Sequence, residues 1–403
     1  MSSWKKVFAS LWTGQFFSTL SSAVVGYAVV FWLSIETGSA EVLAVSTIAS
    51  LLPQLLLGLF TGVLIDRWDR KRIMVAADLF IAVCSAVMAV LFFFGQVKLL
   101  HIYGLLALRS IGSAFHVPAL QASVPLLAPE SELLRVAGIN QVIQSISTIA
   151  GPALAALLIS VLNMTYVLLF DVIGAAIGCI SLLLIHIPNP AKPAAAQAPD
   201  LLYEMKQGLR EITRNTGLLW VFLFMIVAHF FLMPVSVLFP LMTLNHFSGG
   251  TYEMSVVEIA WGIGMLLGGG LIGIFKPKIS KVIQINAMYV VLGLTFLFSG
   301  VLPPDGFLLF VFLTFLAGIS GAVFFSAFTV VLQTLVDPAA LGRVFSLHGS
   351  ITLLPAMIGL LQTGFVADSI GITNAFIIAG AVIGLVGVVS FFVPAIRRMI
   401  AIT

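Results

Sequence analysis

The sequence predicts an all-α integral membrane protein with twelve transmembrane helices. Of the 403 residues, 60% are hydrophobic and only 9% are charged, whereas an ordinary soluble domain has about 25% charged residues. Apolar stretches long enough to cross the hydrocarbon core, about 20 residues each, recur along almost the whole chain. The basic residues fall in short connections between these stretches. A water-soluble surface cannot be built from this composition, so we expect the chain to lie in lipid.

Hydropathy and breaker residues divide the chain into six spans, a linker and six further spans. This predicts a first six-helix bundle over 1–187, a cytoplasmic linker with a surface helix over 188–215, and a second bundle over 216–403. The spans are expected at 7–35, 41–64, 73–95, 100–127, 136–162, 164–186, 217–243, 255–275, 283–301, 307–335, 344–367 and 373–395.

The linker begins with a proline- and alanine-rich run, a composition typical of a spacer. After it, Leu202, Met205, Leu209 and Ile212 recur at helical spacing. This pattern predicts an amphipathic helix that lies on the membrane surface between the two bundles.

The distribution of basic residues predicts the orientation in the membrane, because Lys and Arg are retained in cytoplasmic loops. With both termini placed inside, all but two of the 19 Lys and Arg residues fall in cytoplasmic segments. The exceptions are Lys98 in an outer loop and Arg109 within a span. One missed helix would scramble this asymmetry, so it supports twelve spans with both termini in the cytoplasm.

The two halves of the chain align with each other at a constant offset of 208 residues, without a gap. Trp12 falls on Trp220. Apolar spans often match by chance, so the evidence for an internal repeat comes from matches in the loops, such as Arg135 on Arg343. A parallel repeat of two six-helix halves is typical of secondary transporters whose substrate site lies near the bilayer midplane between the halves.

The connection between the second and third spans contains the segment GVLIDRWDRKR. It resembles the signature loop of the major facilitator superfamily, which implies the major facilitator fold of two six-helix repeats. Asp69 stands where the family pattern has glycine, which is a departure from the pattern at the tight turn, and Asp tolerates unusual backbone angles better than most residues. The residues that match the pattern are Gly62, Leu64, Asp66, Arg67, Arg70 and Lys71.

This loop is expected to act as a conformational latch. A carboxylate at a cytoplasmic helix end can face the positive N-terminus of a neighbouring helix. Asp66 would face the start of the eleventh span near Arg343, in contact in one transport state and apart in the other. The alternative is that the basic residues only set the topology. The expected latch residues are Gly62, Asp66, Arg67, Arg70 and Lys71.

The fifth span contains STIAGPALAA, which is similar to the glycine-proline motif of major facilitator antiporters. Gly151 and Pro152 match that motif, whereas Ser147, Ala155 and Ala156 replace its glycines. The similarity favours export over uptake. The alternative is a packing motif without directional meaning, because small residues let helices approach closely in lipid and proline permits a bend.

Taken whole, the chain resembles the macrolide-efflux branch of the superfamily, through residues 66–79, 108–120, 264–271 and 341–351. The resemblance implies proton-coupled efflux of macrolide-like or other bulky amphipathic compounds across a bacterial cytoplasmic membrane. The proton gradient would supply the energy, with no cofactor. The branch also includes siderophore exporters, so a siderophore or another metabolite stays an alternative substrate, and an importer is a further alternative.

Ionisable groups within spans are the candidates for proton coupling, since a charge at the bilayer centre costs at least ~2.5 kcal/mol. They are Glu258, Asp171, Arg109 and Asp78. We expect Glu258 first and Asp171 second to carry the proton, with Arg109 as a charge that tunes one of them. The alternatives are a structural ion pair for Arg109, a structural partner in the basic loop for Asp78, and an interfacial helix cap for Glu258.

Several polar or adaptable side chains are candidates for lining the substrate cavity, and hydrogen bonds between helices are the alternative. These are Gln15, His116, Asn140, Gln144, His229 and Met233. Cys84 and Cys179 lie within apolar segments and are expected to be packing residues. No metal site is expected.

Several function classes are excluded or disfavoured. The sequence has no phosphate-binding loop, so direct use of ATP is not expected. None of the histidines forms a recognisable catalytic motif, which argues against an enzyme. The loops are too short for a receptor domain, and basic residues form no extended face for nucleic acid. The expected partners are a small amphipathic substrate, protons and membrane lipid, with the chain as a monomer.

Overall fold

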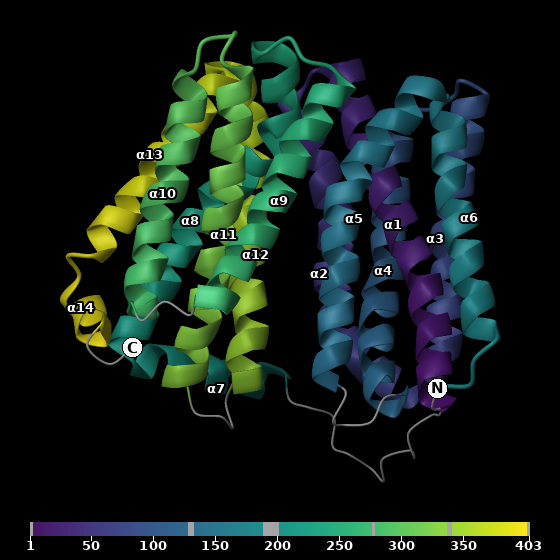
Figure 1. The fold of residues 1–403 in the computed structure, drawn as a ribbon, viewed down its shortest axis with the longest axis horizontal. Coiled ribbons are helices and arrows are strands. Elements are labelled where there is room, and N and C mark those ends of the chain that lie inside the picture. Colours follow the sequence, from purple (N-terminus) through teal and green to yellow (C-terminus); the bar gives the residue numbers. More distant parts are fainter. Residues whose placement is uncertain (1–2, 128–132, 188–200, 276–278, 337–340, 401–403) are drawn as a thin grey trace. The chain divides into compact units, whose positions relative to one another are not determined.

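The computed structural model spans residues 1–403 and describes residues 3–127, 133–187, 201–275, 279–336 and 341–400 (Figure 1). Every described element is a helix, so the all-α prediction is confirmed for this part of the chain. The helices are α1 (Ser3–Thr37), α2 (Ala40–Arg67), α3 (Arg70–Phe93), α4 (Leu99–Leu127), α5 (Leu133–Val161), α6 (Met164–Leu183), α7 (Leu201–Arg214), α8 (Thr216–Leu241), α9 (Thr251–Phe275), α10 (Lys281–Val301), α11 (Phe307–Leu335), α12 (Leu341–Ile370), α13 (Ile372–Ser390) and α14 (Pro394–Ile400).

Within the described residues, ten helices are long and apolar enough to cross a membrane. The chain divides into two compact units. The first holds α1 to α6, except that the stretch Thr37–Ala44 groups with the second unit, which holds α7 to α14. We describe each unit by itself.

The helix bounds of the two halves correspond closely. α4 starts at Leu99 and α11 at Phe307, an offset of 208 residues, and both helices contain 29 residues. α5 and α12 start at Leu133 and Leu341, which is the same offset. The alignment read from the sequence therefore also relates the ends of the helices.

Small residues bring α1 and α6 together in the first unit. Gly14, Ser18 and Ser21 share one face of α1, and a methyl group on Gly174 of α6 would overlap Ser21. A methyl group on Gly14 would likewise overlap Ser181 of α6. In lipid, where no hydrophobic effect drives helices together, such close approach of backbones is the main source of packing energy.

Glycines have the same role in the second unit. Gly264 of α9 lies against the backbone of Phe315 and Gly318 in α11, and Gly293 of α10 lies against the backbone of Gly384 in α13. The pairs α9–α11 and α10–α13 pack along much of their length, and α10 and α13 lie side by side in Figure 1.

A cluster of aromatic side chains fills the core of the second unit. The Phe239 ring lies 6.1 Å from the Phe296 ring, 5.6 Å from the Phe310 ring and 5.4 Å from the Phe376 ring. The edge-on and tilted arrangements match the preference of aromatic pairs. This cluster ties α8 to α10, α11 and α13.

Three features adjoin the apolar spans. The helix predicted in the linker is present as α7, where Ile212 is buried, whereas Leu209 is 49% exposed, so the predicted apolar face is only partly covered. α8 continues into a π-helical turn, Met242–His246. The short α14 follows α13 and packs against α8.

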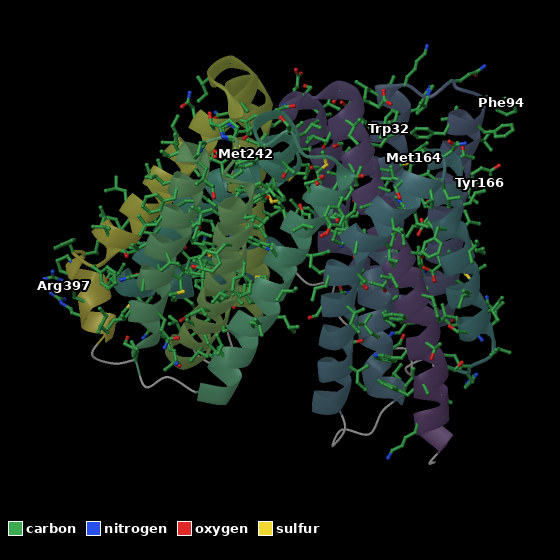
Figure 2. The ribbon with its side chains drawn as sticks, turned by 45° about the horizontal axis from the view of Figure 1, so that its top comes forward. Trp32, Phe94, Met164, Tyr166, Met242 and Arg397 are labelled. Atoms are coloured by element: carbon green, nitrogen blue, oxygen red, sulfur yellow. The ribbon has the colours of Figure 1, made fainter. Side chains whose placement is uncertain are left out.

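Side chains at helix ends are typical of membrane interfaces. Figure 2 shows Trp32, Phe94 and Tyr166 near the same end of the first unit. Phe94 is 67% exposed and Tyr166 is 54% exposed, as expected of aromatic residues at headgroup level. In the second unit, Arg397 of α14 donates a hydrogen bond to the Phe391 carbonyl, at 2.8 Å.

Candidate functional site

The first unit contains a buried ion pair between Arg109 of α4 and Asp171 of α6, with Arg109 Nη1 donating to Asp171 Oδ2. The Asp171 side chain is 1% exposed and that of Arg109 is 12% exposed. The structure therefore brings together two residues that the sequence indicated separately as candidates for proton coupling.

Two serines complete the hydrogen bonding of Asp171. Ser85 of α3 donates to Asp171 Oδ2 at 2.6 Å, and Ser22 of α1 donates to Oδ1 at 2.7 Å. Arg109 Nη1 also donates to Ser85 Oγ. Four helices thus converge on one carboxylate, whose two oxygens both have short contacts. A buried ion pair is tolerated when its remaining polar atoms are satisfied in this way.

A second buried carboxylate, Asp78 of α3, faces His116 of α4. His116 Nε2 lies 3.3 Å from Asp78 Oδ1, and Ser18 Oγ of α1 lies 3.4 Å from the same oxygen. Asp78 is 3% exposed and His116 is 9% exposed. Among the described residues, Asp78 Oδ2 has no hydrogen-bond partner.

The expected role of Asp78 as a structural partner of the basic loop stays a prediction, because the side chain of Arg67 lies outside the described residues. Asp78 lies eight residues after the start of α3 at Arg70, and eight residues of helix span about 12 Å. The basic residue Lys71 instead donates to the carbonyls of Leu183 at 3.1 Å and Ile185 at 2.7 Å. Lys71 thus satisfies carbonyls at the C-terminal end of α6, where a cation is favourable.

Glu258 lies in the second unit, on α9, and is partly buried. No hydrogen bond or ion pair joins it to another described side chain. The alternative that it caps its helix is wrong, because α9 begins at Thr251 and Glu253 does the capping: its Oε2 accepts from the Gly250 N–H at 2.7 Å. Glu258 therefore lies about two turns inside the helix.

The turn before α3 requires no unusual backbone angle at Asp69. Asp69 has ordinary extended backbone angles, φ −68° and ψ 109°, and its side chain accepts from the Arg72 N–H at 3.0 Å. It is the N-cap of α3. Aspartate is among the preferred N-cap residues, so the departure from glycine stabilises this helix start.

The side chains of the latch residues Gly62, Asp66 and Arg67, and of Arg343, lie outside the described residues. Arg70 is described and is 8% exposed. The latch therefore stays a prediction.

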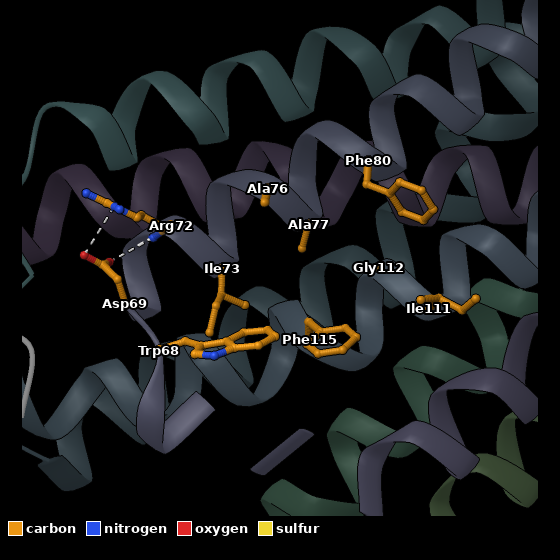
Figure 3. Close-up of a pocket in the computed structure, with 10 residues that line it drawn as sticks. All are labelled: Trp68, Asp69, Arg72, Ile73, Ala76, Ala77, Phe80, Ile111, Gly112 and Phe115. Atoms are coloured by element: carbon orange, nitrogen blue, oxygen red, sulfur yellow. Dashed lines mark hydrogen bonds and ion pairs between the residues drawn. The ribbon is translucent and has the colours of Figure 1, made fainter. Parts of the chain in front are cut away.

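A pocket of about 760 Å³ lies between α3 and α4, beside this turn (Figure 3). Asp69 and Arg72, joined by an ion pair of 3.8 Å, lie at one end of it, and Phe80 and Ile111 lie at the other. The remaining lining is apolar or small, with Trp68, Ile73, Ala76, Ala77, Gly112 and Phe115. No pattern in the sequence indicated this pocket.

The predicted cavity residues on α1 and α5 differ in their surroundings. Gln15 is 4% exposed, and neither polar atom of its side chain has a hydrogen-bond partner among the described residues. Asn140 is partly buried and Gln144 is exposed. In α5, Gly151 and Pro152 are buried, and Gly151 faces Tyr27 and Ala23 of α1. The glycine-proline motif of α5 therefore packs against α1, and its directional role stays a prediction.

The predicted cavity residues of the second unit adjoin a row of aromatic rings. The His229 Nδ1 atom lies 3.0 Å from the Met225 carbonyl, and its ring centroid lies 6.4 Å from that of Phe324. The row continues through Phe328 to His348, whose rings are 4.7 Å apart. Met233, one turn after His229, is partly buried.

Three residues of these clusters were not predicted from the sequence. Ser85 lies seven residues after Asp78, so both fall on one face of α3, and this spacing would have indicated it. His348 and Tyr289, whose ring lies 4.8 Å from that of Phe324, gave no such signal, because a single histidine or tyrosine in an apolar helix has many uses. Within the described part of the chain, no three His, Cys, Asp or Glu residues are placed to hold a metal ion.

Comparison with known proteins gives consistent results. The family model described as Major Facilitator Superfamily matches residues 11–305. The chain is 37% identical over 396 residues to macrolide efflux protein A of Streptococcus pyogenes, covering 98% of both chains. It is 39% identical to macrolide efflux protein A of Enterococcus faecalis, covering 80% of this chain and all of that one.

More distant relatives and solved structures share the scaffold. The multidrug efflux pump Tap of Mycobacterium tuberculosis is 24% identical, with 95% of this chain and 93% of that one covered. A solved nucleoside transporter matches with a TM-score of 0.70 at 15% identity, covering 96% and 99% of the two chains. A solved POT family transporter matches with a TM-score of 0.73 at 14% identity, covering 96% and 95%. At such identities the likeness shows the fold alone.

Proposed function

The chain belongs to the Major Facilitator Superfamily, and from this premise we propose that it exports macrolide-like or other bulky amphipathic compounds as a secondary transporter. The observation behind this proposal is the 37% identity to macrolide efflux protein A over 98% of both chains. The solved structures share the fold at 14–15% identity, so they do not select a substrate.

We propose an architecture of twelve spans in two six-helix repeats, which work by alternating access. The equal offset of α4 to α11 and of α5 to α12 supports the repeat. The glycine contacts of α9 with α11 and of α10 with α13 support units that move as rigid bodies, because close-packed helices do not deform continuously.

The proposed energy source is the proton gradient. Glu258, which has no partner among the described residues, and Asp171, which contacts Arg109, are the proposed proton carriers. Movement of Arg109 away from Asp171 would leave a buried carboxylate without its counter-ion, and such a group binds a proton more readily. One charge crossing 100 mV supplies roughly 2.3 kcal/mol.

A second candidate is efflux of several unrelated compounds, which the 24% identity to the multidrug efflux pump Tap favours. The partly buried methionine and aromatic side chains around His229 suit it, since flexible apolar surfaces accept varied ligands. The two candidates differ in substrate range and share one mechanism.

The test is drug accumulation in a bacterium that lacks its own major efflux pumps. Cells that express the chain should hold several-fold less radiolabelled macrolide than vector controls, and a protonophore should remove the difference. Equal accumulation across a panel of macrolides and other lipophilic drugs, with the protein verified in the membrane, would contradict export. Reporter fusions at both ends test the proposed location in the cytoplasmic membrane with both termini inside.

A further inference from the structure

The two buried carboxylates of the first unit have very different surroundings. Asp171 has short contacts at both oxygens, from Arg109, Ser85 and Ser22. Asp78 has only two long contacts, 3.3 Å to His116 Nε2 and 3.4 Å to Ser18 Oγ, both at Oδ1. Neither His116 Nε2 nor Asp78 Oδ2 makes a well-directed hydrogen bond within the described part of the chain.

This geometry has an energetic consequence. A carboxylate removed from water costs several kcal/mol unless charge and hydrogen bonds compensate it. Asp171 has both forms of compensation, whereas no permanently charged side chain among the described residues contacts Asp78. One proton on the Asp78–His116 pair removes the uncompensated negative charge. The pair is then either a neutral carboxylic acid beside a neutral imidazole or a carboxylate beside an imidazolium.

We propose that Asp78 and His116 form a buried binding site for one exchangeable proton, distinct from the Arg109–Asp171 pair, which fills and empties during the transport cycle. The cycle itself rests on the proposed function. The proton comes from water and returns to water, and it is held between Asp78 Oδ1 and His116 Nε2 while it is bound.

The other groups that face the pair do not provide a competing charge. From α6, Gly178 lies beside Asp78 Oδ2, where an added methyl group would be 3.3 Å away, and the neighbouring Cys179 is a thiol. From α1 the nearest group is the Ser18 hydroxyl. The side chains that the structure describes on α5, between residues 139 and 161, include no ionisable group, and those that it describes on α2 include only Glu41, in the first turn.

The two helices that hold the pair lie very close together. A methyl group on Gly112 of α4 would meet Ile81 of α3 at 2.6 Å and the Ala77 carbonyl at 3.4 Å. Gly112 lies one turn before His116, and Ala77 and Ile81 flank Asp78 in sequence. A small shift of α4 along α3 therefore changes the 3.3 Å distance directly, which couples helix movement to proton binding.

The first arm of the test needs no substrate. Protein with ¹⁵N-labelled histidine is studied by NMR in lipid nanodiscs between pH 5 and 8, and H116Q identifies the His116 ring signals. We expect these signals to titrate in the wild type and to change their titration in D78N, with no change in H101Q, which removes a histidine at the start of the same helix. Ring signals that neither titrate nor respond to D78N would overturn the site.

The second arm measures substrate-driven proton movement in proteoliposomes with a pH dye. In D78N/H116Q, substrate-driven proton movement should fall at least tenfold, while the Kd for substrate should stay within about threefold of the wild-type value. H101Q should behave as the wild type. Normal proton movement in the double variant overturns the proposal. Melting temperatures of all variants identify loss of folding, and the single variants H116Q and D78N then replace the double variant. If the wild type exports nothing, the proposed function fails and the NMR arm alone decides the proton site.

Discussion

At the scale of single residues, the three carboxylates within the helices differ in their hydrogen-bond partners, and these partners distinguish their possible roles. Asp171 is fully hydrogen-bonded to side chains of α1, α3 and α4, Asp78 is loosely contacted, and Glu258 has no partner among the described residues. All three are carboxylates in apolar helices, so their sequence context is alike. The differences arise from the neighbouring helices.

Removing one member of the Arg109–Asp171 pair should destabilise the protein more than removing both. Arg109→Met leaves a buried carboxylate without its cation, at an expected cost of about 3–5 kcal/mol. R109M/D171N removes the unpaired charge and should recover much of this loss. Thermal unfolding in detergent measures the order of stability of these variants. A double variant that melts at a lower temperature than R109M would contradict the prediction.

Glu258→Gln keeps the size of the side chain and removes its titration. It should abolish drug-driven proton movement and concentrative efflux in proteoliposomes, while drug binding and downhill exchange persist. Glu253→Gln is the matched control on the same helix, since it changes only the cap. If lumenal pH still responds normally to drug in the Glu258 variant, Glu258 is not the carrier and Asp171→Asn is the next variant to test.

At the scale of helices, glycines determine which elements can approach one another. α9 contains Gly264 and Gly268, which meet the backbone of α11, and also Gly269 and Gly270, where an added methyl group would meet no other described residue within 4 Å. One helix thus has a packing face and an open face that both consist of glycine. At the packing face, glycine permits close approach of the helices. At the open face, its main effect on stability is its low helix propensity.

Gly264→Ala should lower thermal stability, because the methyl group would overlap the Phe315 carbonyl and the backbone would have to shift. Overpacking of this kind typically costs about 1–3 kcal/mol. Gly269→Ala should be neutral or raise stability by up to about 1 kcal/mol through helix propensity. The readout is the melting temperature in detergent, and equal destabilisation by both substitutions would refute the face assignment.

At the scale of the whole molecule, the chain consists of two compact units with corresponding helix bounds. The expected bundle limits of 1–187 and 216–403 stay a proposal, since Thr37–Ala44 groups with the second unit. In the proposed alternating-access mechanism, the units change their relation while each keeps its own packing. The latch loop is expected to control that change.

Asp66→Asn and Arg70→Ala should therefore impair transport more than ligand binding, because both residues lie near the expected cytoplasmic boundary, far from a midplane site. Transport should fall by about tenfold or more, whereas the equilibrium Kd for drug in detergent should stay within a few fold. Arg72→Ala is a suitable comparison, since the Arg72 side chain is 89% exposed and pairs only across one helical turn with Asp69. Parallel loss of binding and transport would argue against the latch.

The sequence by itself determined the apolar, membrane-spanning character of the helices and the family, and the predicted span limits lie within five residues of the observed helix ends. Apolar length is a local property, and the repeat offset and the loop motif can be read along the chain. Even the helix α7 in the linker followed from the spacing of apolar residues. The family pattern, which has glycine where this chain has Asp69, was a weaker guide to the turn before α3. Whether Asp69 strains that turn or caps α3 depends on local geometry.

Only the tertiary structure decided which polar groups meet. Helices surrounded by apolar groups show little contrast between their faces, so hydropathy does not define their rotation about the axis. The contacts of Asp171 with Ser22, Ser85 and Arg109 join positions 62 to 149 residues apart. Such partners follow from the glycine and serine contacts that set helix distance and rotation, and for this reason Asp78 faces His116.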